Sequence, residues 1–211
     1  MQQNTYKRVE LFLLFVLFPA TLPLSYPLWI KGFIGILGFA YSIWVLVRIE
    51  GIRFFISKKM DWVSFWKRIA ILFPVIMLLT TGYVWLVAPQ HLFFVPKSNP
   101  LLFVFILLVY SILSVWPQEI LYRTFFFQRY ENLFKSKRLF IFVNALLFSL
   151  AHLFFRNTLV IVLTFIGGIL FGLTYVKFKS TTLVTIEHAI YGNWLFTVGM
   201  GQMLGFPGME G

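Results

Sequence analysis

Two acidic side chains fall inside apolar stretches of the sequence, and the first of them has a basic residue close by. Glu119 and Arg123 are four residues apart, so on a helix they share one face and can form an ion pair. Two roles fit this spacing. The pair is either a structural link at a helix end or a carboxylate that Arg123 holds in place for general-base chemistry.

A histidine follows in the next apolar stretch. His152 comes one helical turn after Phe148 in the segment Phe148-Ser-Leu-Ala-His152, so the two side chains lie on the same face of a helix. An imidazole in apolar surroundings is either a hydrogen-bonded structural group or a proton acceptor near neutral pH. The sequence leaves both interpretations open.

The last apolar stretch carries the second acidic residue and another histidine, in Glu187-His188-Ala-Ile-Tyr-Gly192-Asn193. Neighbouring side chains of a helix point about 100° apart, so Glu187 is not expected to be a partner of His188. We expect Glu187 to bond to another helix, for example to a histidine or to Arg123.

Glu119, His152 and His188 come from three separate apolar stretches, so the fold must bring them together before they can act jointly. One chemistry is water activation by Glu119 and His152, with His188 and Asn193 as hydrogen-bond donors to an oxyanion. The other is a divalent metal such as zinc, held by Glu119, His152 and His188. The sequence contains no His-Glu-x-x-His segment, which argues against a zincin-type site.

The composition indicates that these residues sit in a membrane. Hydrophobic residues make up 60% of the chain and charged residues only 12%, about half the soluble average of ~25%. The apolar blocks have the length of roughly twenty residues that a helix needs to cross a bilayer. The chain lacks cysteine, which removes disulfides and thiol chemistry. The net charge of +11 is assigned to membrane orientation and not to nucleic acid, because the basic residues fall between the apolar blocks.

We therefore predict an all-α, polytopic transmembrane bundle of about seven spans, forming a single membrane-embedded domain over residues 1–211. Residues 1–98 form a three-span part, and residues 99–211 form a four-span core with the candidate site. Gly167, Gly168 and Gly172 in the sixth span are expected to allow close helix packing. The predicted spans are Leu11–Trp29, Ile30–Ile49, Ile69–Ala88, Pro100–Trp116, Leu139–Phe155, Asn157–Val176 and Thr181–Met200.

Basic residues set the predicted orientation. With the N-terminus in the cytoplasm and the C-terminus outside, the 18 Lys and Arg residues all fall in cytoplasmic segments except Lys31, Lys97 and Arg156. This partition agrees with the positive-inside rule. The segment Arg48–Arg68 is the most basic of the predicted cytoplasmic connections. A multi-pass protein of the cell membrane is expected.

The three motifs, in this order, resemble the CPBP family of intramembrane proteases, which includes the CAAX-prenyl endopeptidases and abortive-infection-type membrane proteins. The family pattern is Glu-Glu-x-x-x-Arg, then Phe-x-x-x-His, then His-x-x-x-Asn or Asp. This chain has Gln118-Glu119-Ile-Leu-Tyr-Arg123, Phe148-Ser-Leu-Ala-His152 and His188-Ala-Ile-Tyr-Gly192-Asn193. The resemblance covers roughly residues 109–201.

Two positions depart from the family pattern. Gln118 occupies the place of the first glutamate, whose usual role is to activate water, so Glu119 would have to supply the carboxylate. Asn193 follows His188 by five residues instead of four, with Gly192 in the expected place. A π-bulge in this helix would bring Asn193 round to the face of His188.

The resemblance implies an intramembrane endopeptidase, an enzyme that hydrolyses a peptide bond in a membrane-associated or C-terminal peptide substrate. Its polar cavity is expected to open to the cytoplasmic side. The expected partners are membrane lipid and a peptide or membrane-protein substrate. No cofactor is required by the motifs, although the resemblance leaves a zinc-dependent metalloprotease open.

Two other functions fit the same sequence. A catalytically silent scaffold or immunity protein would keep the fold and regulate another protein. A small proton-coupled transporter would use Glu119, Glu187 and the histidines as a proton relay, but the absence of inverted repeats argues against it.

Overall fold

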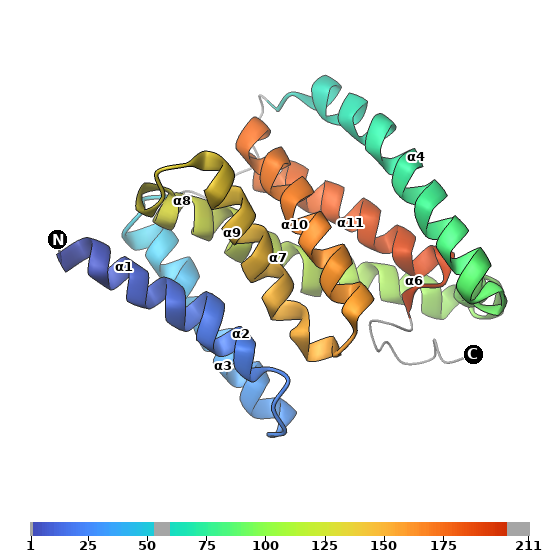
Figure 1. Cartoon of the computed structure of the whole chain (residues 1–211), viewed down its shortest axis with the longest axis horizontal. Helices are drawn as coiled ribbons and strands as arrows, with labels where there is room; N and C mark the ends of the chain where they lie inside the picture. Colours follow the sequence, from blue (N-terminus) through green and yellow to red (C-terminus); the bar gives the residue numbers. More distant parts are fainter. Residues whose placement is uncertain (1, 53–59, 202–211) are drawn as a thin grey trace. The chain divides into compact units, whose positions relative to one another are not determined.

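The computed structural model describes residues 2–52 and 60–201, and within them every regular element is helical (Figure 1). Several elements join end to end into longer helices. The elements are α1 Gln2–Phe12, η1 Leu13–Leu17, α2 Phe18–Thr21, α3 Leu28–Arg48, α4 Trp62–Val87, η2 Pro89–His91, α5 Phe94–Ser98, α6 Pro100–Val109, η3 Tyr110–Val115, α7 Trp116–Glu119, η4 Ile120–Phe125, α8 Phe126–Tyr130, η5 Glu131–Leu133, α9 Lys137–Leu150, η6 Ala151–Phe155, α10 Thr158–Phe178 and α11 Thr181–Val198.

Long apolar helices confirm the prediction of an all-α membrane protein. Among the described residues, five helices are long and apolar enough to cross a bilayer. Helix α11 is not one of these five, since Glu187, His188 and Asn193 reduce its hydropathy. The count of seven spans and the orientation of the termini stay predictions. The five helices are Leu28–Arg48, Trp62–Val87, Pro100–Leu133, Lys137–Phe155 and Thr158–Phe178.

The helix bounds differ most from the predicted ones at two places. The first helical stretch runs from Gln2 to Thr21 instead of Leu11–Trp29, because the chain breaks around Pro23 and Pro27 before α3 begins. Proline removes a backbone donor, so a break there costs no helical hydrogen bond at that nitrogen. The fourth helix continues to Leu133 beyond the predicted end at Trp116, which places the whole Gln118–Arg123 motif inside a helix.

The chain divides into two compact units, each drawn from two separate parts of the sequence. Unit 1 comprises Met1–Ile56 and Pro117–Lys177, and unit 2 comprises Ser57–Trp116 and Phe178–Gly211. Both units therefore combine residues from either side of the predicted boundary at residue 98. Within the basic segment expected to be cytoplasmic, residues 53–59 lie outside the described part of the chain.

In unit 1, α9 and α10 run side by side (Figure 1) and approach each other closely. A Cβ atom added to Gly168 would lie 2.8 Å from the Ala145 Cα atom, so no larger residue fits there without moving the α9 backbone. This contact confirms the predicted packing role for glycine in the sixth span. Phe15 of the first helix packs edge-to-face on Tyr122 and Tyr130, which joins that helix to the α7–α8 segment.

In unit 2, α11 packs along α4 and against the η3 segment. The Trp194 indole donates a hydrogen bond to Thr80 Oγ1 (2.8 Å), and the Tyr191 ring stacks on Phe73 of α4. Helix α11 ends at Val198 and is capped by Gly199, which has a φ of +108°. A Cβ atom at Gly199 would lie 2.1 Å from the His91 carbonyl oxygen, so glycine is required there for both conformation and space.

An ion cluster in unit 1 joins α1, α8 and the connection that follows α3. The Arg129 guanidinium donates to Glu10 Oε2 and to Glu50 Oε1, each at 2.9 Å, and the Tyr130 hydroxyl donates to Glu10 Oε1 at 3.0 Å. Glu10 lies one residue before the first predicted span, yet it is only 6% exposed and belongs to α1.

We predict that Arg129→Met strongly destabilises the protein. Removing one member of a buried ion pair leaves its partners charged and without compensation, at a cost of about 3–5 kcal/mol. Thermal unfolding in detergent should show a lower midpoint for Arg129→Met than for Lys135→Met, a matched change at an exposed position. Equal midpoints for the two variants would contradict a structural role for the cluster.

Candidate functional site

The Gln118–Arg123 motif lies where the long Pro100–Leu133 helix changes its winding. Helix α7 ends at Glu119, and the π-helical segment η4 follows from Ile120 to Phe125. Segments of π-helix often occur at functional sites. The predicted ion pair is present: Arg123 Nε lies 3.4 Å from Glu119 Oε2, and both side chains are fully buried.

Arg123 is held by more than its carboxylate partner. Its Nη1 donates to Asn144 Oδ1 at 3.1 Å, and the Asn144 amide donates in turn to the Tyr122 carbonyl at 2.8 Å. The guanidinium also lies over the Phe148 ring, 4.8 Å from its centroid. Asn144 is not among the site residues predicted from the sequence. It could have been found as an amide side chain in the middle of an apolar span, because placing a polar group inside the membrane is energetically unfavourable.

His152 sits in the η6 turn that follows α9. Its Nδ1 lies 2.8 Å from the Phe148 carbonyl oxygen. Because a carbonyl can only accept a hydrogen bond, the proton of neutral His152 belongs on Nδ1, and Nε2 is the ring nitrogen that can accept a hydrogen bond. The spacing of Phe148 and His152 therefore orients the imidazole through the backbone, while their rings pack with centroids 4.8 Å apart.

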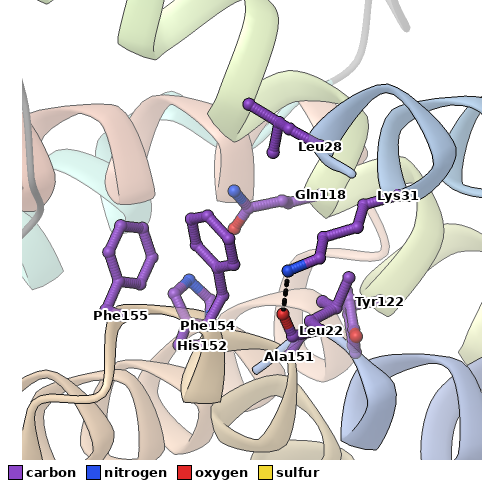
Figure 2. A pocket seen from close by; sticks show the side chains of 9 residues that line it. All are labelled: Leu22, Leu28, Lys31, Gln118, Tyr122, Ala151, His152, Phe154 and Phe155. Carbon is purple, nitrogen blue, oxygen red and sulfur yellow. Dashed lines mark hydrogen bonds between the residues drawn. The ribbon is translucent and has the colours of Figure 1, made fainter. Parts of the chain in front are cut away.

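A pocket of about 300 Å³ in unit 1 contains the imidazole (Figure 2). Gln118 and His152 both line it, and Figure 2 shows the amide and the imidazole directed into the same space. Glu119 is not among the lining residues. The position that departs from the family pattern is thus the one that faces the pocket beside His152. The remaining lining residues are Leu22, Leu28, Lys31, Tyr122, Ala151, Phe154 and Phe155.

In unit 2, His188 is buried in α11 and packs against Tyr110 of the η3 segment. The two rings meet edge-to-face with centroids 6.1 Å apart. Gly192, one turn after His188, makes this approach possible: a Cβ atom there would lie 2.0 Å from the Tyr110 hydroxyl oxygen. The residue that interrupts the family spacing is therefore required for packing.

Asn193 is also held by the η3 segment. Its Nδ2 donates to Ser111 Oγ at 3.0 Å, and the Ser111 hydroxyl donates to the Leu107 carbonyl. The predicted π-bulge in this helix is wrong, since α11 is α-helical from Thr181 to Val198. The π-helical winding lies in the neighbouring helix, at Tyr110–Val115, and it supplies both contacts to the α11 motif.

Glu187 is fully buried and bonds to another helix, as expected, but through a partner that the sequence did not suggest. Arg68 of α4 places its Nε 3.3 Å from Glu187 Oε1, and the Tyr191 hydroxyl donates to the same oxygen at 3.1 Å. One feature of the sequence could have identified Arg68 as a partner: its position among basic residues at the start of the third predicted span. These bonds give Glu187 a structural role in joining α4 to α11.

The structure thus forms two groups of site residues. Gln118, Glu119, Arg123, Phe148 and His152 lie in unit 1, while Glu187, His188 and Asn193 lie in unit 2. Their convergence on one cavity stays a prediction. Within residues 2–52 and 60–201, no group of three or more His, Asp or Glu side chains is arranged to hold a metal ion, and the zinc site predicted at Glu119, His152 and His188 stays a prediction.

Comparison with known proteins found one family model that matches part of the chain. Residues 100–195 match the family model described as type II CAAX prenyl endopeptidase Rce1-like, and all three motifs fall within this range. The match confirms the resemblance predicted from the motifs and indicates the fold of a CAAX-type intramembrane protease. No match was found among curated proteins or solved structures.

We predict that Gly192→Ala lowers stability, because the added methyl group forces Tyr110 out of its place. Overpacking of this kind costs about 1–3 kcal/mol. Gly82→Ala is the matched control, as a Cβ atom at Gly82 meets nothing within 4 Å and alanine favours helix. Thermal unfolding should show a lower midpoint only for Gly192→Ala. A midpoint equal to that of Gly82→Ala would show that the Tyr110 contact is not tight.

Proposed function

We propose that the protein is an intramembrane endopeptidase that hydrolyses a peptide bond in a membrane-associated or C-terminal peptide substrate. The observation that carries the proposal is His152, whose imidazole lines a pocket with its Nδ1 anchored on a backbone carbonyl. The family match over residues 100–195 supports a peptidase. In this proposal Glu119 and His152 activate water, and His188 and Asn193 stabilise the oxyanion.

The first step is attack by water on the substrate carbonyl. Nε2 of His152 accepts a proton from the water while the water oxygen forms a bond to the carbonyl carbon, and the carbonyl π electrons move to the oxygen. The imidazolium then donates this proton to the amide nitrogen as the carbon–nitrogen bond breaks. Free acid and amine leave, and His152 returns to its neutral form. The bond from Nδ1 to Phe148 keeps the imidazole in the required tautomer throughout.

Glu119 supplies the negative charge that this proton transfer needs. Its carboxylate pairs with Arg123 and follows Gln118, which lines the pocket beside His152. A buried carboxylate stabilises a nearby cation more strongly than an exposed one, since the interior screens charge weakly. We therefore assign Glu119 to the water-activating step together with His152, and Gln118 orients the water through its amide.

His188 and Asn193 are the proposed donors to the oxyanion. An asparagine amide carries two N–H groups. One of them donates to Ser111, and we assign the other to the substrate oxygen. Tyr110 and Ser111 hold the two donors in fixed positions, which is the condition for oxyanion stabilisation without reorganisation. These steps use only side chains of the chain, and none is assigned to a metal.

We predict that His152→Gln and Glu119→Gln each reduce cleavage by about 10²–10⁴-fold, the usual cost of losing a general base or its partner. The measurement is hydrolysis of a candidate membrane peptide by the purified protein in lipid vesicles. Gln118→Glu should retain or raise the activity, because it restores the family carboxylate at the pocket. Glu187→Gln should have a smaller effect, because Glu187 bonds to Arg68 and Tyr191.

Thermal unfolding of each variant separates chemistry from stability, since Glu119→Gln also leaves Arg123 buried beside a neutral amide. Loss of cleavage with an unchanged unfolding midpoint supports the proposed roles. Full activity in His152→Gln would remove His152 from the mechanism. A biological activity that needs the protein but survives all four changes would favour the scaffold function.

A further inference from the structure

The pocket that contains His152 lies at one end of unit 1, where two helix connections meet. Leu22 comes from the connection between α2 and α3, and His152 comes from the turn between α9 and α10. The α2 helix contacts the η6 turn, and Arg156 donates a hydrogen bond to the Pro23 carbonyl. Figure 1 shows these two connections close together.

The opposite end of unit 1 is identified by the buried ion cluster. Arg129 bonds to Glu10 near the start of the first helix and to Glu50 just after the end of α3. Lys7 lies 3.9 Å from Glu50. Because α3 runs from the pocket end at Leu28 to this cluster at Arg48, the two ends are separated by a helix of 21 residues. Such a helix spans about 31 Å, the thickness of a hydrocarbon core.

Basic residues are distributed very unequally between these two ends. Arg123 is buried between them and pairs with Glu119. The pocket end carries two described basic residues, Lys31 and Arg156. The cluster end carries eight, which are Lys7, Arg8, Arg48, Arg129, Lys135, Lys137, Arg138 and Lys177. The positive-inside rule assigns the end with more Lys and Arg to the cytoplasm.

We propose that the His152 pocket opens on the extracytoplasmic side of the membrane and receives substrate segments presented there. This reverses the sequence-based expectation of a cavity open to the cytoplasm. The orientation follows from the charges and the pocket position alone, whereas the term substrate rests on the proposed function.

The pocket walls narrow the class of substrate. Leu22, Leu28, Phe154 and Phe155 make it largely apolar. The Lys31 ammonium donates to the Leu22 carbonyl at 2.7 Å and lies 5.2 Å from the centre of the Phe154 ring, so the pocket also holds a positive charge. An apolar segment without basic side chains fits these walls. The substrate class is therefore an exported peptide or the external membrane-proximal segment of a membrane protein, cleaved after export.

Single-cysteine labelling tests the orientation without any assay of catalysis, because the native chain lacks cysteine. Leu24→Cys and Leu28→Cys mark the pocket end, at positions 58% and 70% exposed. Asn132→Cys is the matched control at the exposed surface of the cluster end. A membrane-impermeant maleimide on intact cells should label the first two variants, and Asn132→Cys only after permeabilisation. Labelling of Asn132→Cys alone in intact cells would overturn the proposal.

Membrane vesicles of defined orientation test the substrate class. An impermeant apolar peptide without basic residues is added to right-side-out and inside-out vesicles, with His152→Gln vesicles as the control. Cleavage by right-side-out vesicles alone is expected, and cleavage by inside-out vesicles alone would overturn the proposed orientation. If labelling places the pocket outside and neither preparation cleaves any peptide in a set that varies in length and apolar sequence, the orientation stands and the peptidase function fails.

Discussion

A guanidinium buried among apolar helices is the constraint on which the organisation of unit 1 depends. Arg123 is fully buried, and the transfer of an unpaired charge out of water would cost far more than one helix contact returns. Three interactions of the guanidinium offset this cost: the ion pair with Glu119 on the same helix, the hydrogen bond to Asn144 on α9 and the contact with the face of the Phe148 ring. These partners fix the register of α9 against the α7–α8 segment. The same register sets Phe148, and through its carbonyl it orients His152.

In unit 2, buried polar side chains are also paired, but each has its own partner on a neighbouring segment. The α11 helix carries Glu187, His188 and Asn193, and its neighbours compensate each of them separately. Arg68 reaches Glu187 from α4, while Tyr110 and Ser111 reach the other two from a π-helical segment. The wider winding of that segment shifts its side chains relative to an α-helix. A small residue at Gly192 then admits the Tyr110 ring against the α11 backbone.

The sequence predicted the helical class, the Glu119–Arg123 pair and the family resemblance because these depend on short spacings and on the cost of charge at membrane depth. It could not predict Arg68, Asn144 or the Glu10–Arg129 bond, since these partners are far apart along the chain and no periodic pattern relates them. The π-bulge was expected beside Asn193, where the motif departs from the family. The structure puts the irregular winding on the facing segment instead, because an extra residue can be accommodated by either helix of a packed pair.

The bond between Glu10 and Arg129 also bears on how the protein is made. The two residues are 119 positions apart in sequence. At a synthesis rate of about 5–20 residues per second, the first helix waits roughly 6–24 s before its partner emerges from the ribosome. During that interval Glu10 has neither Arg129 nor Glu50 at its final position, so the carboxylate must be hydrated, protonated or shielded by the insertion machinery. Completion of the ion cluster therefore falls late in biogenesis, and the first helix docks only after most of the chain has entered the bilayer.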